Sequence, residues 1–225
     1  IDIFYRELSH NRSIRTIIMH FVGGRMFQMM NSFFKNNSNL TDIEIKRLRR
    51  SNDIDAHFFS QELKNYTKSL RRLHLSFFGQ ALDIITSLNM HTQLEEIGLG
   101  YNMGIGSNEC TALSTLLRST NQLQKLNLEN NNIDDQGIDS LVLAIKLANV
   151  SSISQLRELK LRSNRSVTFR GWKQVASLLE LPDCNLEVLG ISHNNIGNEG
   201  ARIFADALVN NSTLKTLDLG GNGIT

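Results

Sequence analysis

The chain of 225 residues contains only two cysteines and one proline. Cys110 and Cys184 lie far apart in the sequence and cannot form the disulfide framework of a small secreted domain, which favours a reducing, intracellular and most simply cytoplasmic location. No apolar run approaches the roughly 18 residues that a membrane span requires. The first residues show neither Met nor a signal-peptide pattern. A hydrophobic fraction of 40% with a single proline is typical of a packed chain rather than a disordered one.

The most prominent positive feature is a recurring phrase, Leu-x-x-Leu-x-Leu-x-x-Asn. Its cleanest copy runs from Leu123 to Asn131. Further copies begin at Leu94, Leu156, Leu186 and Leu214, and degenerate copies begin at Ile14, Leu40 and Leu70, where Val22, Leu48 and Phe78 replace the Asn. The starts are 24 to 33 residues apart. Such a period is the signature of a repeat architecture, in which each unit must stack on its neighbours to bury its leucines.

Each unit combines a strand with a helix. The last two leucines of the phrase are two residues apart, as on one face of a strand, and apolar residues follow Gly137 at helical spacing. Parallel strands need such a crossover helix, so the sequence predicts an α/β solenoid with right-handed connections. The predicted strands span residues 16–20, 42–46, 72–76, 96–100, 125–129, 158–162, 188–192 and 216–220. The predicted helices span residues 24–35, 54–67, 79–90, 107–119, 135–148, 171–180 and 199–210.

On these residues the chain resembles the ribonuclease-inhibitor-like class of leucine-rich repeat proteins, along its whole length and most strongly from Leu94 to Thr225. The resemblance implies a horseshoe arc, with a parallel sheet on the concave face and helices on the convex face. It also implies that the ninth-position Asn side chains form a ladder of bonds to adjacent turns, less regular in the N-terminal third. Members of the class include ribonuclease inhibitors, NOD-like receptor sensor regions, tropomodulin-like actin cappers and Ran GTPase activators, most of which bind other proteins.

The repeats predict a single domain over residues 1–225, with about eight repeats. Solenoids need a polar cap at each end, and neither end of this sequence shows one, so we expect a piece of a longer protein. Extracellular members of the class usually carry clustered cap cysteines, which this chain lacks. That absence agrees with the intracellular location inferred from the two isolated cysteines.

The resemblance implies a protein-interaction scaffold, with a GTPase activator of the Ran type or an architectural subunit of a large assembly as alternatives. The residues give no sign of an enzyme, because no catalytic motif appears. The glycines of residues 98–104 miss the dinucleotide-binding spacing. His20, Glu44 and His74 fall on successive strands, but the outer two strands would be about 10 Å apart and no third strong ligand is evident. We therefore expect no catalytic residue, cofactor or metal ion.

The repeat register places positions 3, 5, 7 and 8 of each phrase on or beside the concave face, which is the predicted protein-binding surface. Phe77 and Tyr101 are predicted anchors beside an open floor at Gly98 and Gly100. The charges on this face either select a partner or pair with each other on neighbouring strands. The predicted protein-binding residues are Lys46, Arg72, His74, Phe77, Tyr101, Lys125, Asn127, Glu129, Lys160 and Arg162.

The charged residues are unevenly distributed along the chain. The first 75 residues carry a net charge of +6 and the remainder −4, which indicates either an acidic partner or a solvated rim. No aromatic-interleaved basic motif accompanies these charges, so nucleic acid is not an expected partner.

Asn-x-Ser/Thr triplets begin at Asn11, Asn36, Asn39, Asn65, Asn149, Asn164, Asn210 and Asn211. Most lie at expected turns, where Asn and Ser are favoured for their backbone hydrogen bonds.

Overall fold

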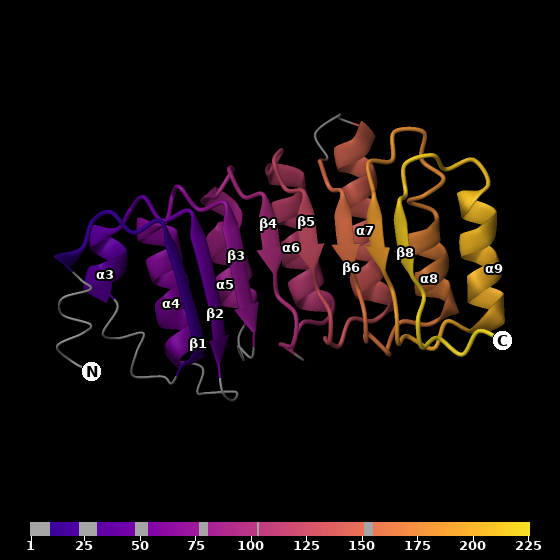
Figure 1. Cartoon of the computed structure of the whole chain (residues 1–225), viewed down its shortest axis with the longest axis horizontal. Helices are drawn as coiled ribbons and strands as arrows, with labels where there is room; N and C mark the ends of the chain where they lie inside the picture. Colours follow the sequence, from indigo (N-terminus) through magenta and orange to yellow (C-terminus); the bar gives the residue numbers. More distant parts are fainter. Residues whose placement is uncertain (1–9, 23–30, 48–53, 77–80, 103, 151–154) are drawn as a thin grey trace.

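The computed structural model describes residues 10–22, 31–47, 54–76, 81–102, 104–150 and 155–225. These residues form one open sheet whose eight parallel strands lie in chain order, with the described helices along one of its faces (Figure 1). We call the opposite face, on which none of the described helices lies, the open face; it is the face that the repeats predict to be concave. Within the described ranges, no helix combines the length and apolar character that crossing a bilayer demands.

All eight strands were predicted, and the register matches the repeat phrase. The third position of each phrase pairs with the third position of the next, as Lys125 does with Glu158. The strands are β1 (Thr16–Val22), β2 (Asp42–Arg47), β3 (Arg72–Ser76), β4 (Glu96–Gly98), β5 (Lys125–Asn127), β6 (Glu158–Lys160), β7 (Val188–Gly190) and β8 (Thr216–Asp218). The prediction of an α/β leucine-rich solenoid is therefore confirmed.

The helices also follow the prediction, with shifted ends. They are α3 (Asn31–Asn36), α4 (Ile54–Tyr66), α5 (Ala81–Ser87) with the 3-10 turn η1 (Leu88–Met90), α6 (Ser107–Ser119), α7 (Asp135–Val150), α8 (Phe169–Ala176) and α9 (Gly197–Leu208). Helix α8 begins two residues earlier than predicted, because the Thr168 side chain caps it by accepting a hydrogen bond from the Arg170 backbone N–H. Residues 24–30 of the first predicted helix lie outside the described residues.

The ladder of asparagines is present from β4 onward. Asn164 is fully buried, and its Nδ2 donates to the carbonyls of Leu128 and Leu161 at 2.9 and 3.0 Å. Its Oδ1 accepts from the backbone N–H of Ile133 at 3.2 Å. Each ladder Asn thus bonds to its own repeat and to the preceding one, which satisfies carbonyls that the turn would otherwise leave buried and unpaired. The donating side chains are Asn102, Asn131, Asn164, Asn194 and Asn222.

Strand length changes where the ladder begins. Strands β1, β2 and β3 have 7, 6 and 5 residues, whereas the strands from β4 to β8 have 3 each. A ladder Asn bonds the carbonyl three residues before it, as Asn102 does with Leu99, and so bends the chain out of the strand. Val22 stands in the Asn position of the first repeat and remains within β1. Leu48 and Phe78 lie outside the described residues.

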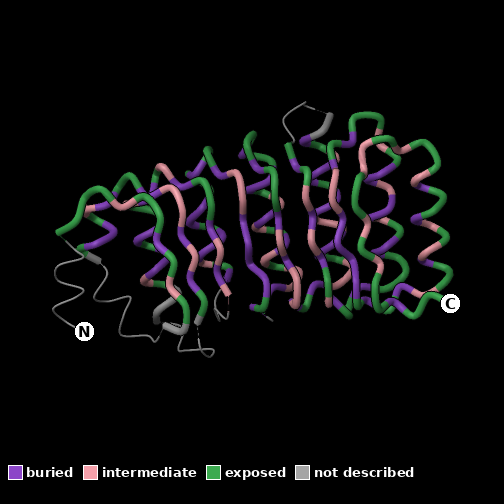
Figure 2. Tube along the Cα trace, viewed as in Figure 1, coloured by how far each residue is buried: buried purple, intermediate pink, exposed green. Residues whose placement is uncertain are grey.

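The core is one continuous cluster of buried side chains from Ile17 to Ala207, between the sheet and the helices (Figure 2). The leucines of the repeat phrase line its sheet side. Leu126, Leu128, Leu159 and Leu161 are exposed by 1% or less, as predicted. The central repeats therefore bury the leucine stripe that defines the phrase.

Two of the Asn-x-Ser/Thr triplets form the same turn at opposite ends of the chain. The Asn11 Oδ1 accepts from the backbone N–H groups of Ser13 and Ile14 at 2.9 and 3.1 Å. The Asn211 Oδ1 accepts equivalently from Thr213 and Leu214, at 3.2 and 2.9 Å. A third triplet begins at the buried ladder residue Asn164. At these three positions the asparagine amide has a structural task, as turn chemistry predicts.

Candidate functional site

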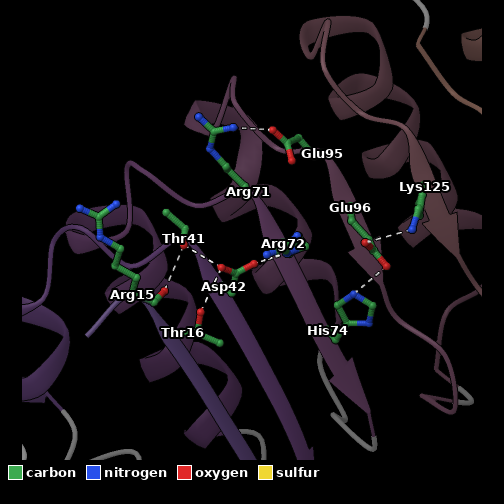
Figure 3. A network of polar contacts seen from close by, with 10 residues as sticks. All are labelled: Arg15, Thr16, Thr41, Asp42, Arg71, Arg72, His74, Glu95, Glu96 and Lys125. Carbon is green, nitrogen blue, oxygen red and sulfur yellow. Dashed lines mark hydrogen bonds and ion pairs between the residues drawn. The ribbon is translucent and has the colours of Figure 1, made fainter. Parts of the chain in front are cut away.

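The N-terminal half of the open face carries a polar network centred on Asp42 (Figure 3). The Arg72 guanidinium donates a hydrogen bond to the Asp42 carboxylate from the next strand. The hydroxyls of Thr41 and Thr16 donate to the same carboxylate at 2.7 and 3.2 Å. Strands β1, β2 and β3 are thus joined through one carboxylate, because their third positions lie side by side.

The environment keeps this pair charged. Burial opposes ionisation of Asp42, but the hydrogen bonds from Arg72 and Thr41 outweigh it and lower the pKa of the carboxyl group. In return, the hydrogen bond to Asp42 raises the pKa of the Arg72 guanidinium. The Arg72 side chain remains 55% exposed, so a protein that approached the open face could still contact it.

A second group on this face centres on Glu96. The His74 Nε2 lies 3.0 Å from one oxygen of the Glu96 carboxylate, and the Lys125 ammonium lies 3.7 Å from the other (Figure 3). His20 instead pairs with Glu44 at 2.7 Å, so His20, Glu44 and His74 do not share a site. Among the described residues, no group of three side chains is arranged to hold a metal ion.

The open floor predicted at Gly98 is wrong. The His74 ring lies over this glycine, since a methyl group added to Gly98 would be 2.5 Å from the His74 Nδ1. The glycine leaves room for the ring on the neighbouring strand, where the two residues are direct register partners. Gly98 therefore accommodates an imidazole of this chain, and a methyl group added to Gly100 would lie 3.4 Å from Asn127 and from the Glu129 carbonyl.

We expect Gly98→Ala to lower the free energy of unfolding by about 1 kcal/mol, because the new methyl group displaces His74 from Glu96. In the double variant Gly98→Ala/His74→Ala the clash is absent. Chemical denaturation of the four proteins should give a coupling of about 0.5 to 1 kcal/mol between the two sites. Strictly additive effects would show that the ring does not rest on the glycine.

In the C-terminal half of the open face, long charged side chains lie beside small residues. The Lys160 ammonium lies 2.5 Å from the Glu158 carboxylate, and the hydrogen bond between them raises the pKa of Lys160. Arg162 is exposed in the same repeat. On the next strand the equivalent positions are Gly190 and Ser192, both buried. A step therefore separates long charged side chains on and after β6 from a low floor at β7.

Gly190 on β7 has room for a methyl group. The three atoms nearest to a methyl group added to Gly190 would belong to Lys160, at 3.4 to 3.9 Å. These are ordinary contact distances, unlike those at Gly98. The backbone φ of Gly190 also lies outside the left-handed region. A methyl group therefore fits at this position without backbone strain.

Tyr101 occupies an unusual backbone position. Its φ is 63°, in the left-handed region that the equivalent positions of the following repeats also adopt. Those positions hold the smaller or more polar residues Asn130, Ser163, His193 and Gly221. The Tyr101 backbone N–H donates to the Glu129 carbonyl at 2.8 Å, and its side chain is 46% exposed. Phe77, its predicted companion, lies outside the described residues.

The remaining predicted residues lie where the register places them. Lys46 is exposed at the end of β2, and Lys125 is exposed on β5. Asn127 uses its Oδ1 to accept a hydrogen bond from the Glu129 backbone N–H at 2.9 Å. The structure thus brings Arg72, His74 and Lys125 into two polar groups joined to acidic neighbours and leaves Lys46 and Arg162 in separate places.

The sequence analysis missed a row of ion pairs at the second position of the repeat phrase. Arg71 pairs with Glu95 at 2.7 Å. Glu187 pairs with Arg157 and Lys215 at 2.5 and 2.7 Å. Hydrogen bonds from Lys215 and Arg157 lower the pKa of the Glu187 carboxyl group. Opposite charges at this position in neighbouring repeats were the available signal.

Comparisons with known proteins agree with this architecture. A family profile described as "Leucine Rich repeat" matches residues 121–142, 183–205 and 210–225. The chain is 29% identical to "NACHT, LRR and PYD domains-containing protein 14" of Mus musculus, over an alignment of 187 positions that takes in 69% of this chain and 18% of that protein. It is 30% identical to "Protein CARMIL" of Dictyostelium discoideum over 114 positions, which is 51% of this chain and 10% of that protein.

Two solved structures share the fold. The first is titled "Leiomodin-1 Actin-Binding Site 2 (ABS2)", with a TM-score of 0.54 and 18% identity, covering 70% of this chain and 88% of that one. The second is a Caenorhabditis elegans tropomodulin C-terminal domain, with a TM-score of 0.50 and 15% identity, covering 70% and 92%. The chain therefore spans a small part of the curated relatives and most of each of these domains.

Proposed function

We propose that this chain, a leucine-rich repeat protein, is a protein-interaction scaffold that holds a protein partner on its open face. The observation that carries the proposal is the step between Lys160 and Gly190. The long, charged side chains stand beside small residues. A protruding side chain of the partner would fit against the small residues, next to the charges. Leucine-rich repeats in the related proteins support an interaction role in general.

The step combines exposed charged side chains with a lower surface of small residues. Arg162 is exposed. The hydrogen bond from the Gly220 N–H is the main cause that lowers the pKa of the nearby Asp218 carboxyl group, and the positive charge of Arg162 adds to it. Gly190 and Ser192 keep the floor at the level of the sheet, so a partner side chain placed there would be surrounded by protein. Well-packed, desolvated pockets of this kind are where binding energy concentrates in protein interfaces. Asn127 and Glu129 border the step on the β5 side.

The N-terminal part of the open face would select the partner by charge. Lys46, Arg72, His74 and Lys125 are accessible, and charged groups at an interface contribute specificity and association rate more than affinity. Tyr101 is the proposed aromatic anchor, together with Phe77. A bulky residue in the left-handed region costs free energy, and such positions cluster at functional sites.

The test is a pair of variants that place the same bulky side chain on opposite faces. Gly190→Trp places a Trp on the open face, at the small residues of the step. Lys173→Trp places a Trp at an exposed position of helix α8, on the opposite side of the sheet. In affinity capture from cell extract, a partner of the open face is retained by the wild type and by Lys173→Trp. With that partner purified, Gly190→Trp should bind at least about 30-fold more weakly, equivalent to about 2 kcal/mol.

Circular dichroism and thermal unfolding are measured on both Trp variants to check that each remains folded. Equal affinity of the two variants for the purified partner would place the interface elsewhere. Loss of binding by Lys173→Trp alone would move it to the helices.

A further inference from the structure

A second surface lies at the edge of the sheet where helices end and strands begin. The turns at this edge lie along one side of the molecule, at the top in Figure 1. In the first five of them, cationic side chains predominate, and all of these are exposed. We call this set the basic edge: Arg12, Arg15, Lys35, Lys64, Lys68, Arg71 and Arg118.

Acidic side chains do not balance this charge. In the described residues of the same five turns, the exposed or half-buried acid is Glu95, which pairs with Arg71 at 2.7 Å. The turns of the later repeats differ, since Glu187 there pairs with both Arg157 and Lys215, and Glu180 and Asp183 are also acidic. The positive charge is therefore local to the N-terminal turns.

Helix stabilisation explains only part of the basic edge. Lys35, Lys64 and Arg118 lie in the last turns of α3, α4 and α6, where a cation interacts favourably with the helix dipole. Arg12, Arg15 and Lys68 lie outside the described helices, and no acidic side chain in the described ranges pairs with them. These three have no evident task in holding the fold.

The fold nevertheless holds cations close together. The Thr41 backbone N–H donates to the Arg15 carbonyl, and the Arg71 backbone N–H donates to the Thr41 carbonyl, both at 2.8 Å. Arg15 and Arg71 are thus two strands apart, about 10 Å at the backbone. In Figure 3 the Arg15 side chain points away from the Asp42 network, while only its carbonyl joins the hydrogen bonds. Its guanidinium is therefore available to a bound anion.

A polar hollow adjoins the basic edge. It has a volume of about 380 Å³ and is lined by Arg71, Thr92, Gln93, Glu95, Asn121 and Gln122. Carboxamides provide both donors and acceptors, so this hollow suits a polypeptide backbone, which presents both kinds of group. It contains one ion pair and otherwise uncharged polar side chains.

We propose that the basic edge and the polar hollow bind an extended acidic segment of a protein. Its carboxylates would lie along Arg12, Arg15 and Lys68, and its backbone would enter the hollow beside Arg71. From β1 to β5 the edge spans about 19 Å, which an extended segment of about six residues covers. No aromatic side chain belongs to the basic edge or the hollow, so the stacking on which single-stranded nucleic acid binding depends is absent. The surface is separate from the step at Gly190.

The probe is a fluorescein-labelled peptide of alternating Glu and Ser, titrated with the 225-residue chain at low ionic strength and followed by fluorescence anisotropy. The double variant Arg15→Glu/Lys68→Glu should bind it at least about 10-fold more weakly, because two attractive contacts become repulsive. The control Lys173→Glu/Arg202→Glu has the same change in net charge on exposed positions of α8 and α9. It should stay within about threefold of the wild type, because distant charges are screened.

A milder pair, Arg15→Gln/Lys68→Gln, gives the same comparison if charge reversal impairs folding. Gly190→Trp should bind the acidic peptide like the wild type, so the two proposed surfaces can fail separately. If the edge and control variants lost the same affinity for the peptide, the effect would come from net charge alone, and the proposed site would be wrong. Tighter binding of a single-stranded oligonucleotide or of anionic vesicles, with the same dependence on Arg15 and Lys68, would overturn the assignment to an acidic protein segment.

Discussion

Leu159→Ala is expected to lower the free energy of unfolding by about 2–5 kcal/mol, through the lost burial of the side chain and the cavity that remains. Leu159 is 1% exposed and lies between its register partners Leu126 and Leu189. Chemical denaturation measures the loss. The matched control is Leu143→Ala, which removes the same atoms from a side chain that is 58% exposed and should change stability by less than about 1 kcal/mol.

The damage from Leu159→Ala should also be local. Stability in repeat arrays is approximately a sum of nearest-neighbour terms, so hydrogen exchange should accelerate most in β6 and in the adjoining β5 and β7. A uniform acceleration from β1 to β8 would mean that the solenoid unfolds as a single cooperative unit, contrary to the expectation.

Asn164→Ala is expected to cost about 2–4 kcal/mol, a loss comparable with that of a core leucine although the side chain is polar. The substitution leaves the Ile133 N–H without its Asn164 partner. It also removes one hydrogen bond from each of the Leu128 and Leu161 carbonyls, which keep their bonds from Asn131 and Asn194. A buried polar group that loses its partner costs about 1–3 kcal/mol, and relaxation of the turn recovers part of that sum.

The control for this variant is Asn121→Ala, which removes an exposed asparagine from a turn and should change stability by about 0.5 kcal/mol or less. Thermal and denaturant unfolding of the two variants compare the contributions directly. Similar small losses in both would show that water replaces the ladder bonds and that burial of Asn164 is not maintained in solution.

Much of the fold was predictable because one phrase recurs. The spacing of the leucines determines strand position, and stacking of equivalent repeats determines register, so the pairing of Lys125 with Glu158 follows from counting. The lengths of the strands were harder to predict from the sequence. The effect of Asn102 on β4 depends on hydrogen bonds to Leu75 and Leu99, which bring together residues from two repeats.

The candidate site was predictable as a surface and not as a set of contacts. The register places His74 and Gly98 side by side, but only the rotamer of His74 decides that its ring covers the glycine. Rotamers depend on all neighbouring side chains, here including Glu96. The ion pairs at the second position of the phrase were missed for a different reason, since that position was assigned to neither the core nor the open face.

The charges of the open face pair with each other on neighbouring strands, which is one of the two predicted roles of their alternation, and selection of a partner stays a proposal. Arg72 and Lys125 pair with acidic neighbours and remain at least half exposed. The acids are more covered than their partners, since the Asp42 and Glu96 side chains are 15% and 24% exposed. A partner carboxylate would therefore add to these pairs rather than replace the acid. In the proposed complex, internal pairing would hold these side chains in place before the partner binds.

The asparagine ladder also bears on how such a chain can change in evolution. Asn194 bonds to the Leu161 carbonyl as Asn164 bonds to the Leu128 carbonyl, at 3.0 and 2.9 Å. Because successive rungs are interchangeable, duplication or loss of one whole repeat would leave every rung with a suitable acceptor. An insertion of one or two residues between Leu161 and Asn164 would instead interrupt the ladder. Gene rearrangements that add or remove complete repeats should therefore be tolerated far better than small insertions in the turns.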